Sequence, residues 1–199
     1  MAERIGLMGG TFDPIHHGHL VAAEEVRYAF SLDKVVFVPA GRPWQKDENV
    51  VTPAELRFEM TCLATVGEDA FDVSRIEIER PGPTFTVETL REFRRCSPEA
   101  ELFFITGSDA ILQILTWKHA EDALRLARFV AVTRPTHDLS AVEGLSDELR
   151  ARISVLEIPA LAISSTDIRS RVAQGRPIRF LVPDAVARFI DEHGLYRPR

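Results

Sequence analysis

The stretch from residue 4 to residue 20 reads RIGLMGGTFDPIHHGHL, and it predicts how the chain begins to fold. The apolar run RIGLM is typical of a short buried strand, and it ends at Gly9-Gly10. Adjacent glycines allow a turn and let a ligand approach the main chain closely. We expect a helix to begin near Gly18-His19, because residues 19–30 carry apolar side chains at helical spacing. Strand, glycine turn and helix together form the opening unit of an α/β fold.

The same alternation of strand and helix continues along the chain. Further strands are expected at 34–39, 71–79, 101–106, 128–133 and 153–159. Helices are expected at 85–95 and from Thr52, which would be an N-cap followed by Pro53 and, three residues after the cap, by Glu55. Apolar strands between helices predict a Rossmann-like, doubly wound α/β fold, with a mostly parallel sheet covered by helices on both faces. Ligands of such sheets bind beyond the carboxyl ends of the strands.

Composition and charge limit the class of protein. The chain has 199 residues, 45% of them hydrophobic, and a net charge of −6. We expect one domain over 1–199, with a C-terminal helical segment at 164–199. The negative charge argues against a nucleic-acid-binding surface, and no apolar run reaches the roughly 18 residues of a membrane span. Cys62 and Cys96 lack metal-ligand spacing and suggest no disulfide framework, so a reducing, cytoplasmic location is expected.

Three histidines around one glycine raise the question of a metal site. His16 and His19 are three residues apart, so they share one face of the first helical turn, while His17 should point elsewhere. The N-terminus of a helix is electropositive and suits an anion such as phosphate. A zinc site would need more ligands, and Asp13 is the only nearby candidate. We therefore predict a phosphate site without a protein-bound metal; zinc and three ordinary surface histidines are the alternatives.

A second helix start lies far along the chain, in ISSTDIRSR at 163–171. Ser164 is a typical N-cap, and Asp167 follows three residues later. Ser165 and Thr166 would then offer amides and hydroxyls at a helix N-terminus, and Arg169 could reach the same anion. The alternative is an ordinary capped helix with a solvated arginine. Two such helix starts facing one crevice could hold a triphosphate.

These two stretches carry a resemblance to a known superfamily. His16-His17-Gly18-His19 and Ile163 to Arg169 resemble the HxGH and ISSTxxR signatures of the nucleotidylyltransferases. The stretches at 39–46, 80–90, 107–117 and 130–135 are similar to those of the bacterial nicotinate-nucleotide adenylyltransferase family. The resemblance covers essentially the whole chain. It implies that nicotinate mononucleotide and the AMP part of ATP are joined to nicotinate adenine dinucleotide, with release of pyrophosphate, in NAD synthesis.

The resemblance also implies roles for individual residues. Catalysis would rest on three residues: His16, His19 and Arg169. ATP would be bound by two groups of residues: Gly9, Gly10, Thr11, Phe12 and Gly18 near the first helix, and Ser164, Ser165 and Thr166 at the second. The mononucleotide would be bound by Lys46, Thr86, Asp109, Trp117 and Arg134. Mg²⁺ would accompany ATP and keep several waters.

For several of the mononucleotide-binding residues, the resemblance implies a specific contact, and an ordinary structural role is the alternative. Trp117 would stack on the pyridine ring, or it would be a core tryptophan. Thr86 would offer its amide to the nicotinate carboxylate. Lys46 would meet the charged groups of the acceptor, although the sequence alone favours a solvated lysine. Trp44 would help to close the site. One departure from the family pattern is Phe85, where many relatives carry tyrosine; little depends on it if the backbone makes the contact.

Other functions stay open at this point. The acceptor could be nicotinamide mononucleotide or phosphopantetheine, although residues 71–95 and Trp117 favour a pyridine nucleotide. A regulatory module that binds nucleotides without turnover would have no need of His16, His19 and Arg169 together. A metal-dependent hydrolase would contain zinc and release AMP. The partners implied are small molecules, with no nucleic acid and no membrane, and a homo-oligomer is left open.

Overall fold

The computed structural model describes residues 2–43, 51–107, 111, 117–133, 146–159 and 161–198. Its strands are β1 (Arg4–Gly10), β2 (Lys34–Pro39), β3 (Phe71–Val73), β4 (Glu101–Gly107), β5 (Arg128–Thr133) and β6 (Ile153–Glu157). Its helices are α1 (His17–Ala29), α2 (Ala54–Thr65), α3 (Thr86–Cys96), α5 (Ala120–Leu126), α6 (Asp147–Arg150), α7 (Ser165–Ala173) and α8 (Asp184–Glu192). Strands and helices alternate as expected.

In the described residues the strands form one parallel sheet in the order β3-β2-β1-β4-β5-β6. The order reverses between β1 and β4, and the loops after these two strands separate there to leave a crevice. This arrangement confirms the predicted doubly wound α/β fold. It also places the loop after β1, which carries the histidines, at the reversal point.

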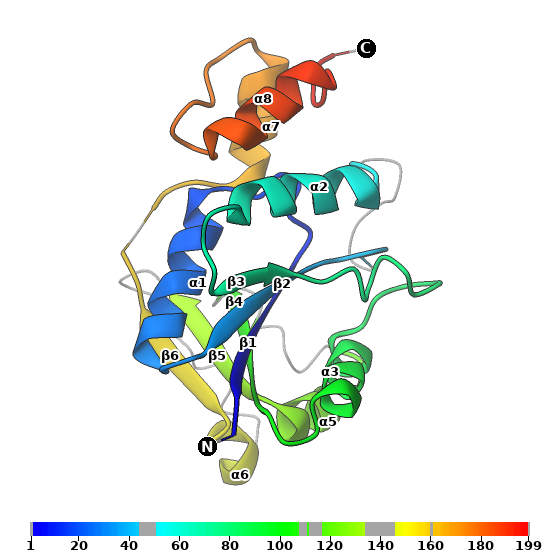
Figure 1. Cartoon of the computed structure of the whole chain (residues 1–199), viewed down its shortest axis with the longest axis vertical. Helices are drawn as coiled ribbons and strands as arrows, with labels where there is room; N and C mark the ends of the chain where they lie inside the picture. The colour runs from blue at the N-terminus through cyan, green and yellow to red at the C-terminus, as the bar shows by residue number, and fades with distance from the viewer. Residues whose placement is uncertain are drawn as a thin grey trace.

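Helices cover both faces of the sheet, and each face has its own apolar core. One core packs α3 and α5 against the strands through side chains such as Leu90, Leu124 and Phe104. The other packs α1, α2, α7 and α8 through Val26, Met60 and further apolar residues. Figure 1 shows α3 and α5 on one side of the sheet, and α2 on the other with α7 and α8 beyond it. The expectation of a single domain over residues 1–199 stays a prediction.

The predicted strand at 71–79 is wrong beyond Val73. The chain turns after β3, because Ile78 and Glu79 both donate their amides to the carbonyl of Arg75. The alternating pattern that suggested a strand has another origin. Ile76 packs against the core, while Glu77 is buried and accepts a hydrogen bond from Thr89 at 2.6 Å.

The start of α2 also differs from the prediction, since the N-cap is Pro53 rather than Thr52. The backbone of Thr52 has other partners: its amide donates to the Asp13 carboxylate at 3.3 Å, and its carbonyl accepts from Arg57 at 2.8 Å. Glu55 does not complete a capping box but pairs with Arg75 at 2.8 Å. Tertiary partners have therefore replaced the local capping pattern. None of the described helices is both long and apolar enough to cross a membrane.

Candidate active site

Two neighbouring cavities lie at the carboxyl ends of β1 and β4. The first, of about 500 Å³, is lined by residues that include His16, Gly18, His19 and Ser164, and we call it the histidine cavity. The second, of about 230 Å³, is lined by residues that include Thr11, Thr86 and Trp117, and we call it the tryptophan cavity. Both are lined by Gly9 and Thr106, so they meet at the ends of β1 and β4. Together they form a continuous site with two compartments.

The two predicted histidines lie face to face in the histidine cavity. The rings of His16 and His19 are stacked, with centroids 3.7 Å apart. The amide of His16 donates to Nδ1 of His19 at 3.2 Å, which makes Nδ1 an acceptor and leaves the ring proton on Nε2. Burial, and then the neighbouring His16, holds the pKa of His19 well below its ordinary value of 6.5. His19 is therefore a neutral ring whose Nε2–H can donate to an anion.

Gly18 has a specific packing role between the two histidines. A Cβ at this position would lie 3.0 Å from Nδ1 of His16, closer than such contacts normally are. The glycine therefore makes room for the His16 ring. His17, by contrast, lines neither cavity, and its amide donates to the carbonyl of Leu181.

The ring of Phe12 lies behind the histidines rather than on a cavity wall. Phe12 is 2% exposed, and its ring meets the edge of His19 with centroids 5.0 Å apart. Its φ of 47° is in the left-handed region, which costs roughly 1–2 kcal/mol for such a residue and must be held by the surrounding packing. A Cβ at Gly10 would lie 2.8 Å from the Phe12 ring, so this glycine is needed for packing inside the protein.

The start of α7 is tied to the loop after β1. Ser164 caps the helix as predicted, because its hydroxyl accepts from the amide of Asp167 at 3.1 Å. The hydroxyl of Ser165 donates to the carbonyl of Pro14 at 2.8 Å, and Arg169 donates to the carbonyl of Asp13 at 2.7 Å. The second donor group of Arg169 reaches the Thr166 hydroxyl at 3.4 Å. The second signature is thus joined directly to the segment just before the first, although more than 150 residues separate the bonded pairs.

The tryptophan cavity contains the predicted acceptor residues that the structure describes. Trp117 is half-buried and packs edge-on against Phe104, with ring centroids 6.1 Å apart, while it also lines the cavity. Thr86 is the first residue of α3, so the electropositive end of this helix faces the cavity. The two readings of Trp117, as a core residue and as a ligand contact, are therefore compatible.

Sequence reasoning missed two charged residues in this cavity. Lys118 lies with its ammonium 4.3 Å from the centre of the Phe85 ring. Glu77 is 8% exposed, and burial raises the pKa of its carboxyl, with Thr89 as a hydrogen-bond donor. For Lys118, the position beside Trp117 was the available signal. No local signal marked Glu77, since it lay in an apparent strand.

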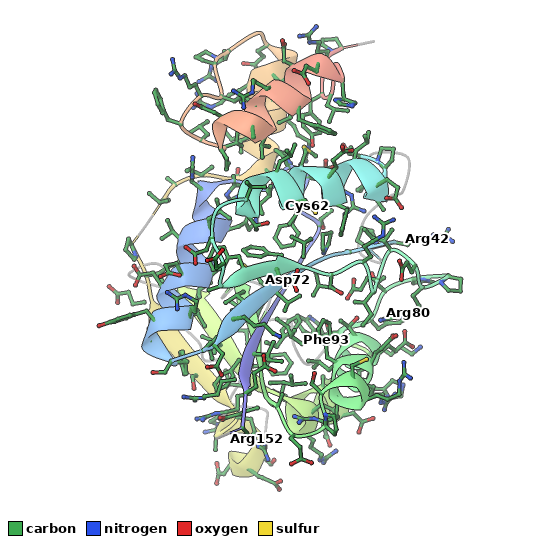
Figure 2. All side chains as sticks on the ribbon, viewed as in Figure 1. Arg42, Cys62, Asp72, Arg80, Phe93 and Arg152 are labelled. Carbon is green, nitrogen blue, oxygen red and sulfur yellow. The ribbon has the colours of Figure 1, made fainter. Side chains whose placement is uncertain are left out.

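Two further residues that support the site were also missed. Arg57 is 1% exposed and donates to carbonyls in two loops, and Tyr196 donates to the Asp13 carboxylate at 2.7 Å. The loop that carries Arg42 and the loop that carries Arg80 run side by side (Figure 2). The amide and the hydroxyl of Thr84 both donate to the carbonyl of Arg42 and so join these two loops. These contacts hold the loops after the strands together.

Some predicted positions fall outside the described residues. They are Trp44, Lys46, Asp109 and Arg134. Within the part of the chain that the structure describes, no group of three or more His, Cys, Asp or Glu side chains could hold a metal ion. The polar side chains that line the histidine cavity are instead imidazole and hydroxyl groups, which can donate hydrogen bonds to a polyphosphate.

Comparison with known proteins defines the class first. Residues 7–171, which include both signatures, match the cytidylyltransferase-like family. Among solved structures, the fold is similar to "Plasmodium falciparum nicotinic acid mononucleotide adenylyltransferase complexed with NaAD", with a TM-score of 0.78 over 98% of this chain and 97% of that one, at 18% identity. A Vibrio parahaemolyticus structure titled as a putative nicotinate-nucleotide adenylyltransferase has a TM-score of 0.70 at 20% identity, covering 99% of this chain and 97% of that chain. The family match defines the chain as a nucleotidyltransferase enzyme, and these structures share its fold.

Close relatives define the family within this class. The chain is 60% identical over 194 residues, 98% of its length and 94% of the relative's, to a probable nicotinate-nucleotide adenylyltransferase of Leifsonia xyli subsp. xyli. It is 58% identical over 190 residues, 96% of its length and 99% of the relative's, to the protein of the same name from Streptomyces coelicolor. The chain belongs to the nicotinate-nucleotide adenylyltransferase family.

Proposed function

We propose that this chain joins nicotinate mononucleotide to the AMP moiety of ATP, giving nicotinate adenine dinucleotide and pyrophosphate in NAD synthesis. The observation that carries the proposal is the meeting of the two cavities at Gly9 and Thr106. One compartment has imidazole and helix N-termini for phosphates, and the other has an indole and a helix N-terminus for an aromatic acid. Relatives named probable nicotinate-nucleotide adenylyltransferase are 58% and 60% identical over at least 96% of this chain, which supports the same reaction.

In this reaction a phosphate oxygen of the mononucleotide attacks the α-phosphorus of ATP. The bond from the α-phosphorus to the oxygen bridging the β-phosphorus breaks, and pyrophosphate leaves with the electron pair. The nucleophile is already an anion, so positioning and charge stabilisation should supply most of the catalysis. We propose that the Nε2–H of His19 and the His16 ring donate to phosphate oxygens where negative charge develops.

The β- and γ-phosphates would lie near the start of α7. In our proposal the amides of its first turn and the guanidinium of Arg169 contact them, together with Ser164, Ser165 and Thr166. The Ser165 hydroxyl already donates to Pro14, so this residue would contribute through its backbone and through the position of α7. Arg169 has five N–H donors, which allows it to keep its contact with Asp13 and still bind an anion.

Magnesium would enter with the nucleotide. The donors described around the histidine cavity are mainly nitrogen groups and hydroxyls, whereas Mg²⁺ prefers carboxylate, phosphate and water oxygens. This donor set fits a Mg²⁺ ion held by the triphosphate and water rather than by side chains. When bound, the ion neutralises charge on the phosphates.

The acceptor would occupy the tryptophan cavity. We propose that Trp117 stacks on the pyridine ring and that the amide of Thr86 binds the carboxylate, while Gly9 to Phe12 lie against the phosphate groups of ATP. Lys46, Asp109 and Arg134 complete the predicted acceptor contacts. A cytoplasmic location is part of the proposal and agrees with the two free cysteines, Cys62 and Cys96.

Steady-state rates of pyrophosphate release with ATP and either mononucleotide test the proposal. We expect nicotinate mononucleotide to be preferred over the amide, because the carboxylate meets the N-terminus of α3 and the cation of Lys118. His19→Ala should stay folded and lose pyrophosphate release, whereas His17→Ala is the matched control. A preference for the amide would overturn the acceptor assignment. Release that continues in His19→Ala would overturn the role of this histidine.

A further inference from the structure

Arg57 is a buried cation that the reaction described above does not use. It lies in the first turn of α2 and is 1% exposed, the largest of the fully buried side chains. A buried guanidinium is costly unless its N–H groups are hydrogen-bonded. Burial of a guanidinium at this cost indicates that Arg57 has a specific role, and the acceptors of its hydrogen bonds show which parts of the chain it holds.

In the described residues the Arg57 guanidinium donates its hydrogen bonds to backbone carbonyls near the active site. Its Nε donates to Thr52 at 2.8 Å, and its Nη1 donates to Thr11 at 2.6 Å. Its Nη2 donates to Ala40 at 2.5 Å and to Gly41 at 3.1 Å. One side chain thus joins the loop after β1, the loop after β2 and the segment that enters α2. Thr11 and Ala40 also line the tryptophan cavity.

Carbonyls held in this way determine where the neighbouring amides point. In a trans peptide the N–H of the next residue is directed opposite to the carbonyl. Carbonyls of Thr11, Ala40 and Gly41 that face Arg57 therefore direct the amides of Phe12, Gly41 and Arg42 away from it. Because Thr11 and Ala40 line the tryptophan cavity, we expect the amides that follow these carbonyls to face the site, where they would suit the phosphate of a nucleotide.

We propose that Arg57 is a positioning residue, which turns three loop carbonyls inward and so presents the following amides to the phosphate groups of the substrates. The inference rests on the proposed function, since it names how that site is preorganised. Lysine cannot replace it, because a single ammonium lacks the planar fork that reaches several separated carbonyls.

The experiment compares Arg57→Lys and Arg57→Met with Met60→Ala. Met60 is fully buried on the same helix as part of an apolar core, so its truncation is a control for lost stability. In both Arg57 variants we expect KM for ATP and for nicotinate mononucleotide to rise by about 10-fold to 100-fold, since displacements of about 1 Å have such effects. At a temperature where all variants are folded, KM of Met60→Ala should stay within about 2-fold of the value for the unmodified protein. Unchanged KM in Arg57→Lys, or an equal rise in Met60→Ala, would overturn the proposal.

Two measurements separate this inference from the proposed reaction. Calorimetric binding of ATP and of inorganic pyrophosphate needs no turnover, so weaker binding in Arg57→Lys supports the inference even if the acceptor is misassigned. Amide NMR spectra of the unmodified protein cover the case in which variants fail to fold. We expect the Phe12, Gly41 and Arg42 amide signals to shift when inorganic pyrophosphate or nicotinate mononucleotide is added. Signals that stay in place under saturating ligand would overturn the proposal.

Discussion

The hydroxyl of Tyr196 donates a 2.7 Å hydrogen bond to the carboxylate of Asp13, across 183 residues of sequence. Asp13 is 3% exposed, and its backbone carbonyl accepts from Arg169. The segment after α8 therefore supports the loop that carries the histidines and the arginine of the second signature. Burial, and then the Asp13 charge, raises the pKa of Tyr196, so the phenol is a proton donor at neutral pH.

Tyr196→Phe should weaken both stability and activity. A hydrogen bond to a charged group contributes about 1.5–3 kcal/mol, so we expect a loss of this size in the free energy of unfolding, measured by urea denaturation. We also expect a lower kcat/KM, because Asp13 holds Arg169. Tyr28→Phe is the matched control, since Tyr28 is 81% exposed. Equal stability of the two variants would show that the Tyr196 contact contributes nothing.

Gly18→Ala should separate stability from activity. Alanine favours a helix over glycine by up to about 1 kcal/mol, so the free energy of unfolding should change little or rise. The added methyl lies 3.0 Å from Nδ1 of His16 and must displace that ring. We expect kcat to fall by about 100-fold, the usual effect of losing one transition-state donor. Thermal melting and steady-state kinetics measure the two effects, and full activity in a stable variant would contradict the assigned role of His16.

His19 should be neutral in the free protein, with its proton on Nε2. Its pKa is lowered by burial and by His16, so the unfolded chain binds a proton below pH 6.5 that the folded protein does not. Stability therefore decreases as pH falls below 6.5 towards the lowered folded value. Nitrogen-detected NMR of the ring should show the Nε2–H tautomer at pH 6.5, and a doubly protonated ring there would refute the assignment. His19→Asn should reduce this part of the pH dependence.

Glu77→Gln should stabilise the protein more at neutral pH than under acidic conditions. Burial raises the pKa of this carboxyl above 4.5, although Arg80 and Arg57 act in the opposite direction. The folded protein thus holds the proton more tightly than the unfolded chain, so stability falls as pH rises from 4.5 through the folded value. Glutamine keeps an oxygen for the Thr89 hydroxyl and has no charge to bury.

The measurement for Glu77 is the urea midpoint of both proteins at pH 4.5 and pH 7. Glu79→Gln is the control, because the Glu79 side chain is 70% exposed. The difference between Glu77→Gln and the unmodified protein should grow towards pH 7. A difference that does not change with pH would mean that Glu77 carries no such penalty.

Local patterns were sufficient for much of the fold and for the two signatures. Three-residue spacing placed His16 and His19 on one helical face, and their rings are stacked in the structure. Ser164 caps α7 as its sequence context predicted. Apolar runs located β1, β2, β4 and β5, since burial on both faces of a parallel sheet leaves a continuous hydrophobic signal. Such features depend on residues within one or two helical turns.

Local patterns failed where a distant partner replaced the local one. The backbone of Thr52 bonds to Asp13 and Arg57 instead of capping α2, and the strand pattern after Val73 becomes a turn that buries Glu77. Arg57 looked like any charged residue of an amphipathic helix, because nothing in its neighbourhood reveals carbonyls in separate loops. Sequence spacing carries no information about such contacts.

The sequence by itself determined the order of the described strands and helices, the doubly wound class and the two helix starts at which the signatures lie. These follow from periodicity and capping, which act between neighbouring residues. Only the tertiary structure decided how the signatures meet: Arg169 on the carbonyl of Asp13, Ser165 on Pro14, and Tyr196 on the Asp13 carboxylate. Buried polar groups must find partners wherever the packed chain brings them, and those partners lie up to 183 residues away.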